Sequence, residues 1–127
     1  VTLPSGRRKN LLEIDPPMPD GRGCYASLTG FVHGEAGIVN PKLNLMMRLR
    51  WDRETFKCLR YWSHNATDMY TVALEPSTSR FSDIQDCIRH GDCLSLEPGE
   101  RQSAWVQVSL ETIDGGVAAE KSEACIC

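Results

Sequence analysis

The pattern of apolar and polar positions predicts a chain built mainly from β-strands. Over residues 43–50 apolar side chains alternate with polar ones, which is the period of a strand with one buried face. Alternation resumes over residues 55–62 after a short polar turn, so we expect these two strands to form a hairpin. Further strands are predicted at residues 24–33, 69–74 and 104–111.

One short helix is predicted between the last two of these strands. Ser82, followed three residues later by Gln85, matches a capping box at a helix start. Ile84, Cys87 and Ile88 follow at helical spacing, and we expect this apolar stripe to pack on the sheet. The sequence therefore predicts an α+β fold, an antiparallel sheet of four or five strands with one helix packed on it.

Length and composition place this fold in one domain. The chain has 127 residues, of which 41% are hydrophobic and 24% charged, as in a single globular domain. Residues 1–23 are rich in Pro, Gly and charge, so we expect an extended or poorly ordered N-terminal arm before a domain at residues 24–127. Apolar stretches fall far short of the about 20 residues that cross a bilayer, so no membrane span is expected.

Cysteine usage indicates an oxidising compartment, because an even number in a short chain is typical of secreted, disulfide-bonded domains. The six cysteines are Cys24, Cys58, Cys87, Cys93, Cys125 and Cys127. We expect three disulfides that stabilise the domain, with the pairing left open. The alternative is a zinc site that also uses His33, His64 and His90, but no two cysteines are separated by two residues. We therefore expect neither a metal nor another cofactor.

Two further features agree with secretion. Asn65-Ala66-Thr67 is an acceptor sequence for N-glycosylation, which makes Asn65 a candidate glycosylation site on an exposed loop. Because the chain begins at Val1 with no initiator methionine, we expect that a leader peptide has been removed.

Charge is unevenly distributed along the chain, whose net charge is −3. The first 60 residues carry ten Lys/Arg and six Asp/Glu, whereas the remainder carries four and eleven. A candidate basic patch on the predicted hairpin consists of Arg48, Arg50, Arg53 and Lys57. The patch could meet an acidic partner, or it could be a solvated face balanced by Asp52 and Glu54. We do not expect a nucleic-acid partner, because the aromatic side chains between these cations are needed for the core.

Acid–base chemistry is the main enzymatic alternative. His33, Glu35, His64 and His90 could together cleave RNA by proton transfer, as in a small secreted ribonuclease or ribonuclease-like toxin. No spacing ties these residues together, and the chain lacks a nucleophile elbow, a phosphate loop and an H-E-x-x-H motif. We therefore expect that the protein is not an enzyme.

The segment Arg60-Tyr61-Trp62-Ser63 resembles the Arg-Tyr-Trp-Thr stretch of the LARS effectors, cysteine-rich avirulence proteins that plant-pathogenic fungi secrete. The resemblance implies a virulence or avirulence effector that acts by binding a plant host protein or immune receptor, or masks another effector from recognition. It also implies action in the apoplast or, after translocation, inside the plant cell. Besides the effector and the ribonuclease, a third option for the function is a killer toxin or an inhibitor.

We expect the same segment to have a structural role. Cys58 and Trp62 share one face of the predicted strand, and both are expected in the core. This arrangement would leave Arg60 to bond backbone carbonyls or a carboxylate.

Overall fold

The computed structural model describes residues 10–21, 23–113 and 125–126. In chain order, its elements are β1 (Gly23–Thr29), β2 (Glu35–Asn40), β3 (Leu45–Trp51), β4 (Cys58–Asn65), β5 (Tyr70–Ser77), α1 (Ile84–Arg89), β6 (Val106–Thr112) and β7 (Cys125–Ile126).

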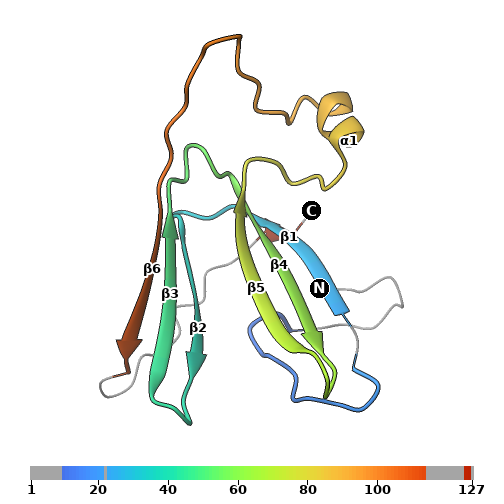
Figure 1. Cartoon of the computed structure of the whole chain (residues 1–127), viewed down its shortest axis with the longest axis vertical. Helices are drawn as coiled ribbons and strands as arrows, with labels where there is room; N and C mark the ends of the chain where they lie inside the picture. Colours follow the sequence, from blue (N-terminus) through green and yellow to red (C-terminus); the bar gives the residue numbers. More distant parts are fainter. Residues whose placement is uncertain (1–9, 22, 114–124, 127) are drawn as a thin grey trace.

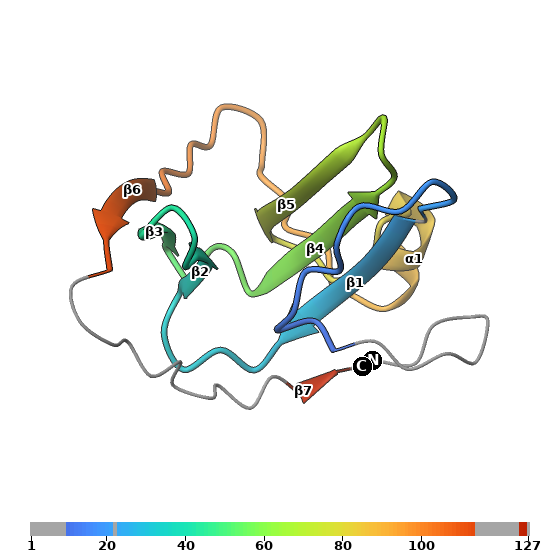
Figure 2. The ribbon, with the colours of Figure 1, turned by 90° about the horizontal axis from the view of Figure 1, so that it is seen from below.

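These strands form two antiparallel sheets (Figures 1 and 2). One sheet has the order β5-β4-β1-β7 and the other the order β2-β3-β6. The chain passes between the sheets at residues 30–34, 52–57 and 78–105, while the pairs β2–β3 and β4–β5 stay within one sheet. The expected α+β fold, a single sheet covered by a helix, is therefore wrong, because the protein is mostly β.

The predicted hairpin between residues 43–50 and 55–62 is also wrong. Both strands exist, as β3 and β4, but they belong to different sheets. Alternation identifies which face of a strand is buried, but it does not identify the strand's neighbour. The predicted strand at residues 24–33 ends at Thr29, before Gly30 with its positive φ of 81°, and the chain then crosses to β2.

The core lies where the two sheets meet. Leu49 and Trp51 of β3 pack with Leu59 of β4, and Leu28 and Leu74 border this cluster. A second cluster lies within the β5-β4-β1-β7 sheet, formed by Cys24, Ala26 and Tyr61.

Helix α1 is only six residues long and is not the cover that the sequence predicts. Its N-cap is Asp83 and not Ser82 of the predicted capping box, and the Asp83 carboxylate accepts hydrogen bonds from the backbone of Gln85 and Asp86. Of the predicted stripe only Cys87 is buried, whereas Ile84 and Ile88 are exposed. With six residues the helix makes fewer than two turns, so it is too short for an apolar stripe that packs along a sheet.

Residues 10–21 of the predicted arm run along the β4–β5 turn without a long strand or helix of their own (Figure 2). The N–H of Met18 donates to the carbonyl of Asn65 at 2.8 Å, and the Tyr70 hydroxyl donates to the carbonyl of Asp15 at 3.2 Å. Residues 1–9 lie outside the described residues.

Gly34 permits β2 to approach the end of β3. The N–H of Trp51 donates to the Gly34 carbonyl at 2.8 Å, and a Cβ on Gly34 would lie 2.2 Å from the carbonyl oxygen of Trp51. Because that oxygen belongs to the backbone, it cannot move aside as a flexible side chain would.

We predict that Gly34→Ala lowers the free energy of unfolding by roughly 1–3 kcal/mol, the usual cost of overpacking. Urea denaturation followed by tryptophan fluorescence measures the change. Gly23→Ala is the control, because the nearest atoms to its Cβ lie at 3.7 Å. Equal stability of Gly34→Ala and the unmodified protein would contradict the close approach.

Candidate functional site

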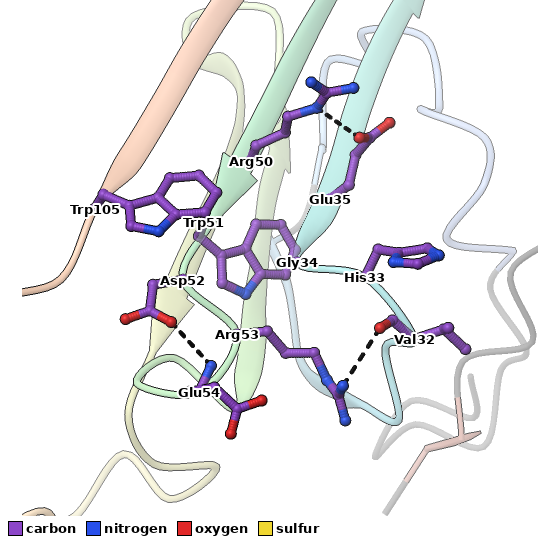
Figure 3. A pocket seen from close by; sticks show the side chains of 10 residues that line it. All are labelled: Val32, His33, Gly34, Glu35, Arg50, Trp51, Asp52, Arg53, Glu54 and Trp105. Carbon is purple, nitrogen blue, oxygen red and sulfur yellow. Dashed lines mark hydrogen bonds and ion pairs between the residues drawn. The ribbon is translucent and has the colours of Figure 1, made fainter.

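An open cleft of about 530 Å³ lies at the end of the β2-β3-β6 sheet (Figure 3). Its lining comes from the connection after β1, the start of β2, the end of β3, the following turn and the residue before β6. The lining residues are Val32, His33, Gly34, Glu35, Arg50, Trp51, Asp52, Arg53, Glu54 and Trp105.

The two tryptophan side chains of the cleft differ in how exposed they are and in whether they bond the rest of the protein. Trp51 is 2% exposed, its Nε1 donates to the Phe56 carbonyl at 3.0 Å, and its ring meets Phe31 edge-on. Trp105 is held by its backbone carbonyl, which accepts from the N–H of Asp52 at 3.0 Å, while its side chain is about half exposed. Trp51 therefore belongs to the core, and Trp105 offers its ring to a ligand.

The turn beside Trp105 is held by one carboxylate. Asp52 accepts from the backbone N–H of Glu54 at 3.1 Å and from the Thr55 hydroxyl at 2.7 Å. Gln102, from the long connection before β6, donates to the same hydroxyl at 3.2 Å. Asp52 is therefore committed to local structure and not to a ligand.

Carboxylates on neighbouring strands neutralise half of the predicted basic patch. Arg50 donates to Glu35 at 2.7 Å, and Arg48 bonds both Glu35 and, at 3.0 Å, Glu111 of β6. Arg53 donates to the carbonyl of Val32 at 3.4 Å. The expected partners of the patch, the carboxylates of residues 52 and 54, are not those of Arg48 and Arg50.

These ion pairs shift the titration of both glutamates. The hydrogen bond from Arg50, with a further one from Arg48, lowers the pKa of Glu35 against the opposing effect of desolvation. Hydrogen bonds from Arg48 and then Ser109 lower the pKa of Glu111. A lowered carboxyl pKa stabilises the fold above the usual pKa, and this stabilisation is lost as the pH falls through the folded-state value.

Three side chains of the cleft remain available. Within the described part of the chain, the His33 imidazole, the Glu54 carboxylate and the indole N–H of Trp105 make no hydrogen bond or ion pair. The cleft therefore offers charges of both signs beside an exposed aromatic ring, because Arg53 lies next to Glu54.

Trp105 immediately precedes β6, which carries an exposed apolar surface of its own. We define the β6 surface as Val106, Val108 and Leu110, whose exposed fractions lie between 51% and 75%. Val106 and Val108 pair with Trp51 and Leu49 of β3, so their side chains lie on the core face of the sheet. The alternation predicted for residues 104–111 is confirmed as a strand, but its apolar side is uncovered.

The histidines of the ribonuclease hypothesis lie in separate places. His33 lines the cleft with Glu35, whereas Nδ1 of His64 bonds the carbonyl of Met69 at 3.0 Å. His90 caps α1 and stacks on Phe81. The structure brings together only His33 and Glu35.

The Arg60–Ser63 segment anchors the connection that leads into α1. Arg60 donates to the carbonyls of Ser79, at 3.3 Å, and of Phe81, which confirms the expected bonding to carbonyls. Tyr61 and Ser63 are buried on the opposite face. On the face of Arg60, Cys58 is buried as expected, but the expected burial of Trp62 in the core is wrong, because Trp62 is only half-buried.

The expected disulfides are absent among the described side chains. Cys24, Cys58 and Cys87 are buried free thiols, and Cys93 is an exposed one. The Cys58 thiol donates to the carbonyl of Ser79 at 2.9 Å, and burial raises its pKa. Cys87 Sγ lies 3.0 Å from the Ser79 hydroxyl. The side chain of Cys125, and Cys127 entirely, lie outside the described part.

Asn65 is not on an exposed loop, contrary to the glycosylation prediction. It ends β4, is buried, and donates from Nδ2 to the carbonyl of Pro16 at 3.3 Å. A glycan at this nitrogen would have to break that contact.

We predict that Arg48→Gln raises the pKa of Glu111 and, to a smaller extent, that of Glu35, which keeps Arg50. Carboxyl ¹³C titration by NMR measures both values. The variant should also lose less stability than the unmodified protein on acidification below about pH 4.5, the usual glutamate pKa. Arg53→Gln is the control, and an equal shift of Glu111 in that variant would contradict the assignment.

We predict that a short pulse of maleimide labels Cys93 before Cys24, Cys58 and Cys87, which stay protected until unfolding, because among these four described thiols only Cys93 is exposed. Peptide mass mapping without reduction measures the order of labelling. Disulfide-linked peptides among these four residues would contradict the free thiols.

No helix in the described ranges has the length and apolar character needed to cross a membrane.

Comparison with known proteins identifies a family for this chain. No curated protein matches the chain. No solved structure matches it either. Residues 29–110, more than half of the chain, match the family model described as a domain of unknown function, DUF4432. The chain therefore belongs to the DUF4432 family.

Proposed function

We propose that this chain acts by binding a partner protein, which docks on the β6 surface with the cleft as the polar end of the interface. The observation that carries the proposal is the exposure of three large apolar side chains on one face of β6, next to the exposed Trp105. Contiguous apolar surface of this kind marks interaction sites in folded proteins.

The composition of the surface favours a protein over a nucleic acid. Trp and Arg are enriched in protein interfaces, and Trp105 and Arg53 lie in one cleft. Arg48 and Arg50 are already paired with carboxylates, so they do not form a free cationic patch for phosphates. Charges of both signs at the cleft suit the polar rim of a protein interface.

The finer proposal is that the partner is a plant host protein or an immune receptor, met in the apoplast or inside the plant cell. The resemblance of Arg60-Tyr61-Trp62-Ser63 to the LARS effectors supports this choice of partner. That segment holds the connection before α1 and is not part of the β6 surface. The ribonuclease alternative has less support, because its histidines lie on separate elements.

The test begins with a photoreactive amino acid placed at Leu110 or, as a matched control, at Ile88. Both positions are exposed apolar residues, but Ile88 belongs to α1. We expect cross-linking to a specific leaf protein from Leu110 only. Equal cross-linking from both positions would contradict the proposed interface.

With that partner purified, we predict that Leu110→Ser weakens binding at least 10-fold and Ile88→Ser leaves it unchanged. Burial of one leucine side chain contributes about 1.5–3 kcal/mol, and about 1.4 kcal/mol corresponds to a factor of ten. Calorimetric titration measures both affinities. Unchanged affinity of Leu110→Ser would overturn the proposal.

A further inference from the structure

The chain that leaves α1 turns back over the last turn of the helix. Gly91 has a positive φ of 62°, and its N–H donates to the carbonyl of Ile88 at 3.1 Å. The N–H of Asp92 donates to the carbonyl of Cys87 at 2.9 Å. These two bonds form a Schellman motif, in which a glycine ends a helix and reverses the chain. Cys93, the next residue, therefore returns to the helical turn that carries Cys87.

Side-chain hydrogen bonds fix the residue before Cys93. The Asp92 carboxylate accepts from the Ser79 hydroxyl at 2.8 Å and from the backbone N–H of Arg80 at 2.9 Å. The same hydroxyl lies 3.0 Å from Cys87 Sγ. Asp92 and Cys87 thus meet at one hydroxyl group, which holds the backbone at Cys93 next to the helix.

The thiols of Cys87 and Cys93 lie within reach of each other. Desolvation raises the pKa of Cys93, and the charge and hydrogen bonding of Cys87 raise it further. Hydrogen bonding between two thiols requires their sulfur atoms to be neighbours. Cys87 is 6% exposed, whereas Cys93 is an exposed residue. A reagent in solution can therefore reach Cys93 but not Cys87.

Cys58, a third cysteine in this region, is bonded elsewhere. Its thiol donates to the carbonyl of Ser79 at 2.9 Å and lies 3.4 Å from the carbonyl oxygen of Ser77. Burial raises its pKa most, and the other contributions from described side chains come from Ser77, Arg60 and Asp92 and not from a thiol. The two sulfurs in contact are therefore those at the end of α1.

We propose that Cys93 and Cys87 form an oxidation site, at which Cys93 reacts with a small-molecule disulfide and Cys87 then closes an intramolecular disulfide. In the first step the Cys93 thiolate attacks one sulfur of the small disulfide, forms a mixed disulfide and expels the other half as a thiolate. In the second step the Cys87 thiolate attacks Cys93 Sγ and expels the remaining half. Two cysteine thiols are oxidised, the small disulfide is reduced to two thiols, and the two protons end on these thiols. Until an oxidant reaches Cys93, both cysteines stay free.

The closed disulfide holds the end of α1 by a covalent bond. In the reduced protein two backbone hydrogen bonds and the Asp92 carboxylate hold this end. The disulfide joins the last turn of the helix to the residue after the Schellman motif, so it opposes local opening of both backbone bonds. Neither cysteine belongs to the β6 surface, so the oxidation is independent of the proposed partner binding.

The test uses the full chain with glutathione disulfide as the oxidant. Trypsin cleaves after Arg80, Arg89 and Arg101, so Cys87 and Cys93 fall in separate peptides, 81–89 and 90–101. After alkylation and digestion without reduction, we expect a glutathione adduct on peptide 90–101 first and a link between the two peptides later. Dithiothreitol should reverse both. A link from either peptide to another cysteine, or no link at all, would overturn the pair.

Two matched serine variants separate the roles of the cysteines. Cys87→Ser should stop at the adduct on Cys93, because the second thiolate is missing. Cys93→Ser should slow adduct formation at Cys87 at least about 10-fold relative to Cys93 in the unmodified protein, because the Cys87 thiol is buried. Equally fast modification of Cys87 in Cys93→Ser would overturn the order of the steps. If Cys87→Ser does not fold, the order of adduct and link in the unmodified protein still decides.

Hydrogen exchange measures how firmly the disulfide holds the end of α1. We expect the amides of Gly91 and Asp92 to exchange several-fold more slowly after oxidation, because their bonds to the helix open less often. The amide of Trp51, bonded to Gly34 in the β2-β3-β6 sheet, is the control and should not change. Equal exchange of Gly91 and Asp92 before and after oxidation would overturn this effect of the disulfide.

Discussion

The burial of Trp51 between the two sheets is the interaction on which the rest of the structure depends. Its side chain is almost fully enclosed, and it packs with Leu49 and Leu59 in the cluster that joins β3 to β4. Its indole N–H bonds the carbonyl of Phe56, and its backbone N–H bonds that of Gly34. One residue thus sets the end of β3, the start of β2 and the crossing to β4. The walls of the cleft are the segments that meet at this residue.

The two faces of the β2-β3-β6 sheet are in different states. On the polar face Arg48 links Glu35 of β2 to Glu111 of β6, so charges on three strands are satisfied within the sheet. On the other face the core covers Leu49 and Trp51 but does not extend to Val108 and Leu110. Removing apolar surface from water is favourable, so a contiguous exposed apolar area on a folded protein marks a site where a partner can bind. This imbalance is why the proposed function lies on β6.

Two of the described cysteines, Cys58 and Cys87, are held by burial and hydrogen bonds and not by cross-links. Cys58 and Cys87 both contact Ser79: Cys58 bonds its carbonyl, and Cys87 lies beside its hydroxyl. Asp92 accepts a hydrogen bond from the same hydroxyl. The thiols act as small buried side chains with weak hydrogen bonds, a common role for free cysteine. The connection into α1 is thus held by hydrogen bonds, including those from Arg60.

Local pattern alone determined the strands at β3, β4, β5 and β6 and the place of the short helix. Alternation and capping act over a few residues, so they can be read along the chain. Only the tertiary structure decided that β3 and β4 belong to separate sheets, because strand pairing depends on contacts between distant residues. It also decided that Arg48 pairs with Glu35 and Glu111, which lie 13 and 63 residues away. The apolar alternation of β6 was visible in the sequence, but its exposure was not, because exposure depends on what the other sheet leaves uncovered.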